Sequence, residues 1–314
     1  MVPSPKSGTG KGPETARELD SPMRLSYSAV SSYEKCPLSY RFQYIDRLEV
    51  APSPYLSFGR SMHSALQWLY SRKVSEPPAL NDLLLELDAC WESDGFCDSE
   101  EEDSFRRHAT EVLTAYYQKN VADFRLPLAI EERFEIEMDG YALSGVIDRI
   151  DRRPDGSYEI IDYKTNRKLP ELRRLREDLQ LPIYQIACSK TWGISPSKLT
   201  FYYLIPNQKY TTKPQDAQGI SRVLERLNRT AEAITARRFP ATPGPLCPWC
   251  SFQDVCPERI KADSMEEKYA SRYRSLLKRR DALLEAIAEL EREMTQQGFS
   301  PGGRSCEERR DEAN

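Results

Sequence analysis

The chain has 314 residues, 39% of them hydrophobic, which is enough for one large domain or two small ones around a real core. Its formal net charge of −4 excludes a protein coated uniformly in positive charge, so any groove for nucleic acid must be local. The sequence has no apolar run of membrane-spanning length and no apolar N-terminal stretch like that of a secretory signal, so we expect a cytoplasmic protein.

Helices are predicted first along the chain. Residues 1–24 are rich in Pro, Gly, Ser and Lys and have the composition of a disordered tail. A helix opens at Ser26 and continues to Cys36, and a second helix at 58–70 has apolar residues at helical spacing. Two more helices, at about 80–93 and 103–122, flank the acidic stretch 98–103, which is most simply a solvated loop.

Strands follow from about Ala129, where apolar and polar residues begin to alternate. Tight turns at Asp139-Gly140 and Asp155-Gly156 divide this part into three antiparallel strands. A helix at about 171–191, a strand at 199–206 and a helix at 215–238 come next. This order predicts an α/β fold in which a central mixed β-sheet is flanked by helices, with a helical N-terminal part.

A long charged helix is predicted at 263–297, after a domain that spans 25–262. The apolar residues of this helix recur seven apart, as in a coiled coil, but Arg280 interrupts the second apolar row. The helix is therefore expected either to pair with another helix or to pack against the body of the protein. Residues 298–314 again have the composition of a disordered tail.

Two aspartates and a lysine mark a candidate catalytic centre. Asp148 and Asp162 are each seven residues from Asp155, so across a hairpin centred there they face each other on one side of the sheet. Two opposed carboxylates repel unless a cation lies between them, and the pair suits Mg²⁺ or Mn²⁺. Lys164 points to the same side and could orient or deprotonate a metal-bound water. The alternative is a charged edge hairpin in which Asp162 and Lys164 form a salt bridge.

The residues beside this centre indicate a buried sheet that leads into a basic segment. Strand alternation places Ile150 and Ile160 on the face of the two acids, and Ile147 and Ile161 on the other face. Six cations lie between residues 164 and 176, where they form either a guide for a nucleic-acid strand or a solvated helix face.

The runs GVIDRID and EIIDYKT resemble the core of the PD-(D/E)XK nucleases, specifically the RecB-like branch, which includes helicase-linked recombination nucleases and CRISPR-associated adaptation nucleases. The resemblance extends from about Leu25 to Pro257. It implies a restriction-endonuclease-like core in which Asp148, Asp162 and Lys164 are catalytic and the two aspartates hold the metal.

Two helical motifs extend the resemblance. The family motif G-x-x-x-H matches at Gly59 and His63, which implies that His63 binds or positions the metal, although a lone histidine on a helix is more often structural. The motif Q-x-x-x-Y matches at Gln180 and Tyr184, which implies contacts to the DNA backbone or support of the site, whereas the alternative for Tyr184 is ordinary helix packing. Pro182, between the two, is expected to start or kink that helix.

Glutamates on the preceding strand are further candidates. Glu132 or Glu135 could be an accessory acid, although exposed strand carboxylates are commoner.

A cysteine cluster indicates a second metal site. Cys247, Cys250 and Cys256 lie within ten residues, in a loop that a metal could close, and Cys36 is the natural fourth ligand. Spacing alone leaves zinc and an iron–sulfur cluster equally open. The family resemblance implies a structural four-iron four-sulfur (4Fe-4S) cluster on these four cysteines, with zinc as the less favoured occupant.

The combined expectation is a metal-dependent DNA nuclease. By resemblance, its substrates are single-stranded ends or flaps in DNA repair or recombination. The sequence has no GxxxxGK[ST] signature, so a helicase or another recombination protein would have to supply ATP-driven unwinding. The alternatives are a DNA-binding or helicase-partner subunit that does not cut, and a zinc-stapled regulatory protein.

Overall fold

The computed structural model describes residues 23–71, 76–260 and 265–297. The predicted tail at 298–314, and the predicted N-terminal tail up to residue 22, lie outside these residues. The chain divides into two compact units, one that ends at Thr242 and one that begins at Pro243. Within the described residues, no helix is both long enough and apolar enough to cross a membrane.

Strands of the first unit form one mixed sheet, six-stranded within the described residues. The central path is β1-β3-β4-β5-β6, and β2 pairs with the other edge of β3. β2, β3 and β4 form the predicted antiparallel meander, whereas β1 is parallel to β3 and β5 is parallel to β4. The strands are β1 Met23–Leu25, β2 Ala129–Glu137, β3 Tyr141–Arg152, β4 Tyr158–Lys164, β5 Pro196–Tyr203 and β6 Gln208–Thr212.

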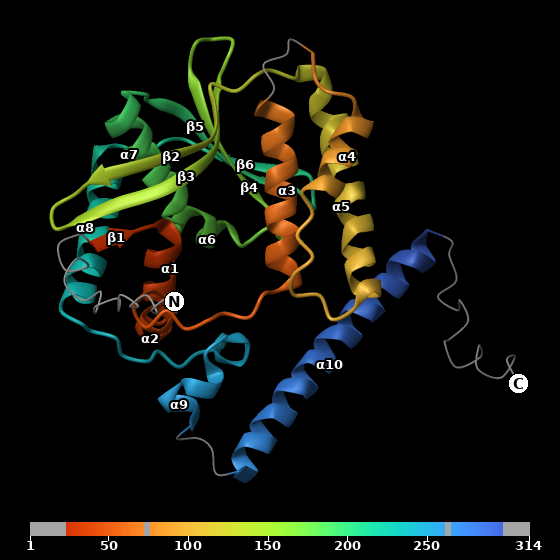
Figure 1. The fold of residues 1–314 in the computed structure, drawn as a ribbon, viewed down its shortest axis with the longest axis vertical. Coiled ribbons are helices and arrows are strands. Elements are labelled where there is room, and N and C mark those ends of the chain that lie inside the picture. Colours follow the sequence, from red (N-terminus) through yellow and green to blue (C-terminus); the bar gives the residue numbers. More distant parts are fainter. Residues whose placement is uncertain (1–22, 72–75, 261–264, 298–314) are drawn as a thin grey trace, which may run out of the picture. The chain divides into compact units, whose positions relative to one another are not determined.

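Helices cover both faces of this sheet (Figure 1). On one face α1, α6, α7 and α8 pack around a core that contains Ile160 and Phe201, and on the other α3, α4 and α5 pack around Ile161 and Tyr163. The predicted fold class is therefore confirmed. These helices are α1 Tyr27–Lys35, α3 Pro54–Ser71, α4 Leu80–Ala89, α5 Ser99–Asn120, α6 Leu172–Glu177, α7 Gln180–Trp192 and α8 Ala217–Thr235; the short elements of this unit are α2 Pro37–Tyr40, η1 Arg41–Ile45 and η2 Val121–Asp123.

Capping residues explain where several helices begin. The hydroxyl of Ser26 accepts the N–H of Ala29, which starts α1 where the sequence predicted it. The prediction that the acidic stretch 98–103 is a loop was wrong. Asp98 is the N-cap of α5 and accepts the N–H of Glu101, and Glu100, Glu101 and Glu102 lie in the first helical turn. Free N–H groups and the helix dipole favour negative charge at this position.

The segment predicted as one helix at 171–191 is two helices. α6 ends at Glu177 and α7 begins at Gln180, with Asp178 extended between them. The carboxylate of Asp178 accepts the N–H of Gln180 at 2.7 Å and so helps to start α7. Pro182 is the third residue of α7, where the N–H that proline lacks would have had no partner within the helix.

Two strands were not expected from the sequence. β1 begins at Met23, and β6 follows β5, which ends at Tyr203 rather than at residue 206. β1 is too short and β6 too polar to show clear alternation of apolar residues. The prediction for Ile147 was also wrong, because it packs in the same core as Ile150 and Ile160 rather than on the opposite face.

The second unit contains two short turns and two helices among its described residues. They are η3 Cys247–Trp249, η4 Gln253–Val255, α9 Pro257–Ile260 and α10 Met265–Gln296. α10 is the long charged helix that the sequence predicted.

Candidate active site

The candidate acids lie where the pairing of β3 opens. Backbone pairing between β3 and β4 runs to Arg149 and Ile161, so Asp148 and Asp162 are the next residues in the register that the Asp155 turn predicted. On the other edge of β3, pairing with β2 skips the position opposite Asp148, which is Glu131. Glu131 has a φ of 48°, a left-handed conformation that interrupts a strand. Residues 147 and 149 of β3, on either side of Asp148, keep the same register with β2.

Three side chains meet at this opening. His63 of α3, Glu131 of β2 and Asp148 of β3 bring one ligand atom each to within 4.8 Å of the others. The Nδ1 atom of His63 lies 3.5 Å from Asp148 Oδ2 and 3.8 Å from Glu131 Oε1. Its Nε2 atom lies 3.1 Å from the carbonyl oxygen of Tyr163, whose N–H donates to Asp148 Oδ2 at 2.7 Å. The backbone of Tyr163 therefore positions both the histidine and the acid.

Burial and neighbouring charges shift the pKa values in this cluster. Asp148 is 7% exposed, and its burial together with the negative charge of Asp162 raises its pKa to about 7. Burial alone would lower the pKa of His63. The hydrogen bond to Glu131 and the charges of the two aspartates outweigh it and raise the pKa of His63 to about 9. The negative charges of these acids therefore favour a positively charged group or ion at this position.

A second set of contacts fixes Asp162 and Lys164. Gln180, the first residue of α7, donates from Nε2 to Asp162 Oδ1 at 2.7 Å and accepts from Lys164 Nζ at 2.5 Å. The same Nε2 donates to the hydroxyl of Tyr184 at 2.8 Å. Lys164 Nζ also lies 2.7 Å from Asp162 Oδ2. This salt bridge is not on an edge hairpin, because β4 lies between β3 and β5.

The donor atoms at this site suit a divalent ion. Asp162 Oδ2 is buried and, although Lys164 is near, has no hydrogen bond within the described residues. Carboxylate oxygens with one imidazole are ligands that Mg²⁺ and especially Mn²⁺ accept. His63, Glu131 and Asp148 lie together, whereas the Asp162 carboxylate contacts Lys164 and Gln180. The residues therefore fit a metal held by the first three, with Asp162 beside them.

A buried polar network, which the sequence analysis missed, supports Tyr163. Arg149 is 8% exposed and donates to the Tyr163 hydroxyl at 3.2 Å and to both carboxylate oxygens of Asp151 at 2.6 and 2.8 Å. Its guanidinium lies 3.8 Å from the ring centre of Tyr70, and the Tyr116 and Tyr163 hydroxyls are 3.0 Å apart. The network fixes the residue whose backbone contacts His63 and Asp148.

The glutamate that reaches the site is Glu131, not Glu132 or Glu135 as the sequence analysis considered. Glu135 forms an exposed salt bridge with Arg24 at 3.4 Å. The signal for Glu131 was present in the sequence. A hairpin centred on residues 139 and 140 places Glu131 opposite Asp148 by the same symmetry that paired the two aspartates.

Comparison with known proteins gives the family. The family model of the PD-(D/E)XK nuclease superfamily matches residues 24–257. This chain belongs to the PD-(D/E)XK nuclease superfamily. The matched region includes every residue of the site described above, and it also includes the three clustered cysteines.

Relatives of this superfamily member occur in phages and bacteria. The Gene 69 protein of Mycobacterium phage D29 is 25% identical over 276 residues, which cover 76% of this chain and 98% of that protein. One of the ATP-dependent helicase/deoxyribonuclease subunits of Streptococcus agalactiae is 28% identical over 184 residues, which cover 54% of this chain but only 17% of the streptococcal protein. A solved structure of a Eubacterium rectale protein has a TM-score of 0.48 at 11% identity, over 82% of this chain and 94% of that one.

The four cysteines of the predicted cluster in this PD-(D/E)XK chain are divided between the two units. Cys36 follows α1 in the first unit, and its Sγ accepts the N–H of Thr242 at 3.5 Å. Cys247, Cys250 and Cys256 lie at the short turns of the second unit, where Cys247 Sγ accepts the N–H of Gly244 at 3.2 Å. All four are free thiols and partly buried.

Proposed function

We propose that this chain is a metal-dependent DNA nuclease that hydrolyses phosphodiester bonds at single-stranded ends or flaps, in DNA repair or recombination. The observation that carries the proposal is the convergence of His63, Glu131 and Asp148 within 4.8 Å, beside the buried Asp162 and its partner Lys164. Concentrating buried carboxylates is costly for a fold, and the cost is best explained by chemistry that needs a divalent cation.

The metal would be Mg²⁺ or Mn²⁺, held by His63, Asp148 and Asp162 together with Glu131. When bound, the ion would polarise the phosphate and lower the pKa of the attacking water. Lys164 would orient that water and offset the negative charge that develops on the phosphate, since Gln180 holds its ammonium group at 2.5 Å. Gln180 and Tyr184 would act as positioning residues for Asp162 and Lys164 or contact the DNA backbone.

The basic segment that begins at Lys164 and continues through α6 would guide the phosphates of the strand. Arg174 and Arg176 on this helix are exposed. Contacts of this kind release counterions from DNA, so the affinity should fall steeply as the salt concentration rises.

The four cysteines Cys36, Cys247, Cys250 and Cys256 would hold a structural 4Fe-4S cluster. This part of the proposal is supported by their number, their spacing and the family resemblance. Protein purified without oxygen should be brown and contain iron and acid-labile sulfide in equal amounts, and Cys36→Ala should lose both and most of the stability of the fold. A stable, colourless wild type that contains zinc instead would contradict it.

The proposal also covers the domain bounds, the cellular location and the partner of the protein. The nuclease domain would span residues 25–262, with 263–297 as a separate helix. The protein would act in the cytoplasm. A helicase or another recombination protein would be its partner, in line with the name of the streptococcal relative.

The test is digestion of end-labelled single- and double-stranded DNA with Mg²⁺ or Mn²⁺, in protein purified without oxygen. Wild type should cut, EDTA should stop it, and Lys164→Ala should lower kcat by about 100-fold or more, because it removes the charge that faces the phosphate. Lys190→Ala is the matched control, since Lys190 is an exposed lysine in the last turn of α7.

Each result has a clear meaning. Metal-dependent cutting that Lys164→Ala loses and Lys190→Ala keeps would establish the activity and its centre together. A folded wild type that binds DNA without cutting it would instead favour a non-catalytic DNA-binding or helicase-partner role.

A further inference from the structure

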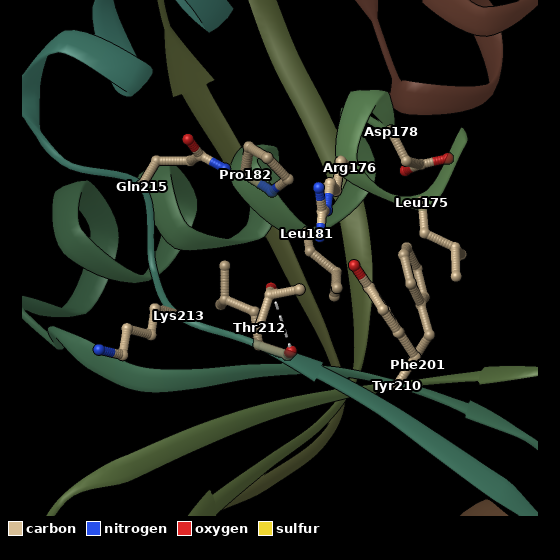
Figure 2. A pocket seen from close by; sticks show the side chains of 11 residues that line it. Leu175, Arg176, Asp178, Leu181, Pro182, Phe201, Tyr210, Thr212, Lys213 and Gln215 are labelled. Carbon is tan, nitrogen blue, oxygen red and sulfur yellow. Dashed lines mark hydrogen bonds between the residues drawn. The ribbon is translucent and has the colours of Figure 1, made fainter. Parts of the chain in front are cut away.

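A pocket of about 340 Å³ lies between the α6–α7 segment and strands β5 and β6 (Figure 2). Leu199 and Phe201 of β5 and Tyr210 and Thr212 of β6 line its sheet side, and the hydroxyl of Tyr210 points toward the helices. Its volume is at the lower end of the range for sites that enclose a small organic molecule. The proposed metal site does not use this pocket.

The strand register places the pocket on the same sheet face as the catalytic acid. Asp162 pairs with Phe201, and Phe201 pairs with Tyr210, so the three form one row across β4, β5 and β6. Neighbouring strands are about 4.8 Å apart, so the Tyr210 side of the pocket lies about 10 Å from Asp162. Lys164 Nζ lies 5.1 Å from the ring centre of Phe201. The Phe201 ring is therefore a wall shared by the pocket and the catalytic lysine.

The helical side of the pocket is joined to the catalytic centre as well. Asp178 lines the pocket, and its Oδ1 accepts the N–H of Gln180, whose side chain contacts Asp162 and Lys164. Its Oδ2 accepts the hydroxyl hydrogen of Tyr27 at 2.6 Å. A ligand in this pocket would therefore contact the residue that starts α7 beside the proposed metal site.

The charges of the pocket indicate the class of ligand. Arg176 and Lys213 line it, are exposed, and form no ion pair within the described residues. Asp178 is the acid of the lining, so cations outnumber it two to one. Apolar and aromatic walls flanked by cations match a nucleotide, whose base can stack on an aromatic ring and whose phosphates are anionic.

We propose that this pocket holds one unpaired nucleobase of the DNA strand that is cut, next to the scissile phosphate, while Arg176 and Lys213 contact the flanking phosphates. The inference rests on the proposed nuclease function and adds the feature that selects the substrate. A base in a duplex is stacked and paired, and removing it costs a few kcal/mol, so only an unpaired or easily flipped base enters at low cost. The pocket thus favours single strands.

The direct test is an abasic scan with the full-length protein. The substrate is a DNA hairpin with a fluorescent single-stranded tail, in which one abasic residue is moved along the tail. Affinity is measured by anisotropy with Ca²⁺, and kcat/KM is measured with Mn²⁺. One position near the cut should lower affinity and kcat/KM about tenfold, the loss expected for one stacked base. Equal values at every position would overturn the pocket.

Two variants locate the effect. Arg176→Ala should lower the affinity for the unmodified tail about fivefold through loss of a phosphate contact, whereas Arg229→Ala, an exposed arginine on α8 outside the lining, should bind as wild type does. Thr212→Phe should fill the pocket, so that the abasic residue no longer matters at any position. An abasic effect of unchanged size in Thr212→Phe would place the base elsewhere and overturn the proposal.

Hydrolysis of bis(p-nitrophenyl) phosphate separates this inference from the nuclease itself. That diester has no base, so the ratio of DNA cleavage to diester hydrolysis should fall in Thr212→Phe. If wild type hydrolyses both substrates but the abasic residue has the same effect at every position, the nuclease function is supported and the base-binding pocket is contradicted. If wild type hydrolyses neither substrate, but its affinity with Ca²⁺ depends on the position of the abasic residue, the nuclease function is contradicted and the base-binding pocket is supported.

Discussion

Gln180 connects the groups on which the proposed chemistry depends. Its amide donates to Asp162 and accepts from Lys164, with heavy-atom distances of 2.7 and 2.5 Å. A glutamate at this position could accept but not donate, and a leucine could do neither. The amide therefore sets the separation between the acid and the lysine, and it does so from the first residue of a helix whose start is fixed by Asp178.

Replacing Gln180 by leucine should affect catalysis more than binding. Gln180→Leu keeps the volume but frees Lys164 and Asp162 to move, so we expect kcat to fall about 100-fold while KM changes by less than about threefold. Steady-state cleavage of single-stranded DNA measures both constants. Gln118→Leu, an exposed glutamine on α5, is the control. A kcat within twofold of wild type in Gln180→Leu would show that the amide does not position the lysine.

Glu131 should contribute to metal affinity. Its carboxylate lies 3.8 Å from His63 Nδ1 and belongs to the three-residue cluster. Glu131→Gln removes one negative charge there, so the Mn²⁺ concentration that gives half-maximal cleavage should rise about tenfold or more. Glu135→Gln, on the same strand but in a surface salt bridge, should leave it unchanged. If the two variants need the same Mn²⁺ concentration for half-maximal cleavage, Glu131 does not contribute to the metal site.

The sequence predicts a residue of this site when symmetry within a hairpin places it there. Counting from the turn at Asp155 paired Asp148 with Asp162, and the same count from residues 139 and 140 would have found Glu131. The Arg149 network has no such signal. Its tyrosines come from α3, α5 and β4, so nothing short of the folded structure brings them together.

At the scale of elements, β3 is the strand that creates the site. β2 pairs along one edge of it, whereas the other edge is shared between β1 at Tyr141–Leu143 and β4 at Arg149–Arg152. Residues 144–148 of that edge therefore have no strand partner in the described part of the chain. Beyond the last backbone pair of β3 and β4, the N–H of Tyr163 donates to the side chain of Asp148 instead of to a backbone carbonyl.

Gly145 lies in this stretch of β3, opposite Phe134 of β2, and has no room for a side chain. A Cβ atom there would lie 2.7 Å from the ring of Phe134, which is buried on the paired strand β2. Gly145→Ala must push that ring into a packed core, so we expect a loss of about 1–3 kcal/mol in the free energy of unfolding. Urea denaturation followed by circular dichroism measures the loss.

Gly59→Ala is the matched control for this prediction. Its added Cβ would meet Thr165 Oγ1 at 3.4 Å, an ordinary contact, and it lies inside α3, where alanine is the better helix former. We expect a gain of about 0.5–1 kcal/mol. A loss in Gly59→Ala as large as that in Gly145→Ala would mean that the space around each glycine does not decide the effect.

Elements were predictable where local periodicity agrees with the tertiary structure. The meander of β2, β3 and β4 alternates clearly and ends in glycine turns with φ of 84° and 81° at Gly140 and Gly156. The break between α6 and α7 was missed because apolar periodicity continues across Asp178, and only that carboxylate's hydrogen bonds show that the helix restarts. β6 was missed because it is a polar edge strand, defined by its pairing with β5.

At the scale of the whole molecule, one family model spans residues from both compact units. The match runs from residue 24 to residue 257, whereas the units meet between Thr242 and Pro243. The site residues all belong to the first unit, and three of the four candidate cluster ligands belong to the second. Catalysis can therefore be tested through the divalent metal with every cysteine intact, whereas the cysteine variants test the proposed iron–sulfur cluster and, at Cys36, the stability of the fold as well.

The divalent metal should stabilise the first unit, and this effect can be measured without any substrate. An ion that binds only the folded state adds RT ln(1 + [L]/Kd), about 2.7 kcal/mol at a hundred times Kd, and each kcal/mol of this corresponds to a rise of about 2–4 °C in Tm for a domain of this size. Mn²⁺ should therefore raise the Tm of wild type above its value in EDTA.

Asp162→Asn should abolish most of that rise, because it removes a buried negative charge that acts on both His63 and Asp148. Asp155→Asn is the control, since this exposed residue is in the turn of the same hairpin and contacts Ser157 and Arg153. The Tm of Asp155→Asn should be lower than that of wild type both in EDTA and with Mn²⁺, but Mn²⁺ should raise it by the same amount as in wild type. Equal rises in both variants would mean that the ion binds without Asp162, whereas no rise even in wild type would contradict the proposed metal site.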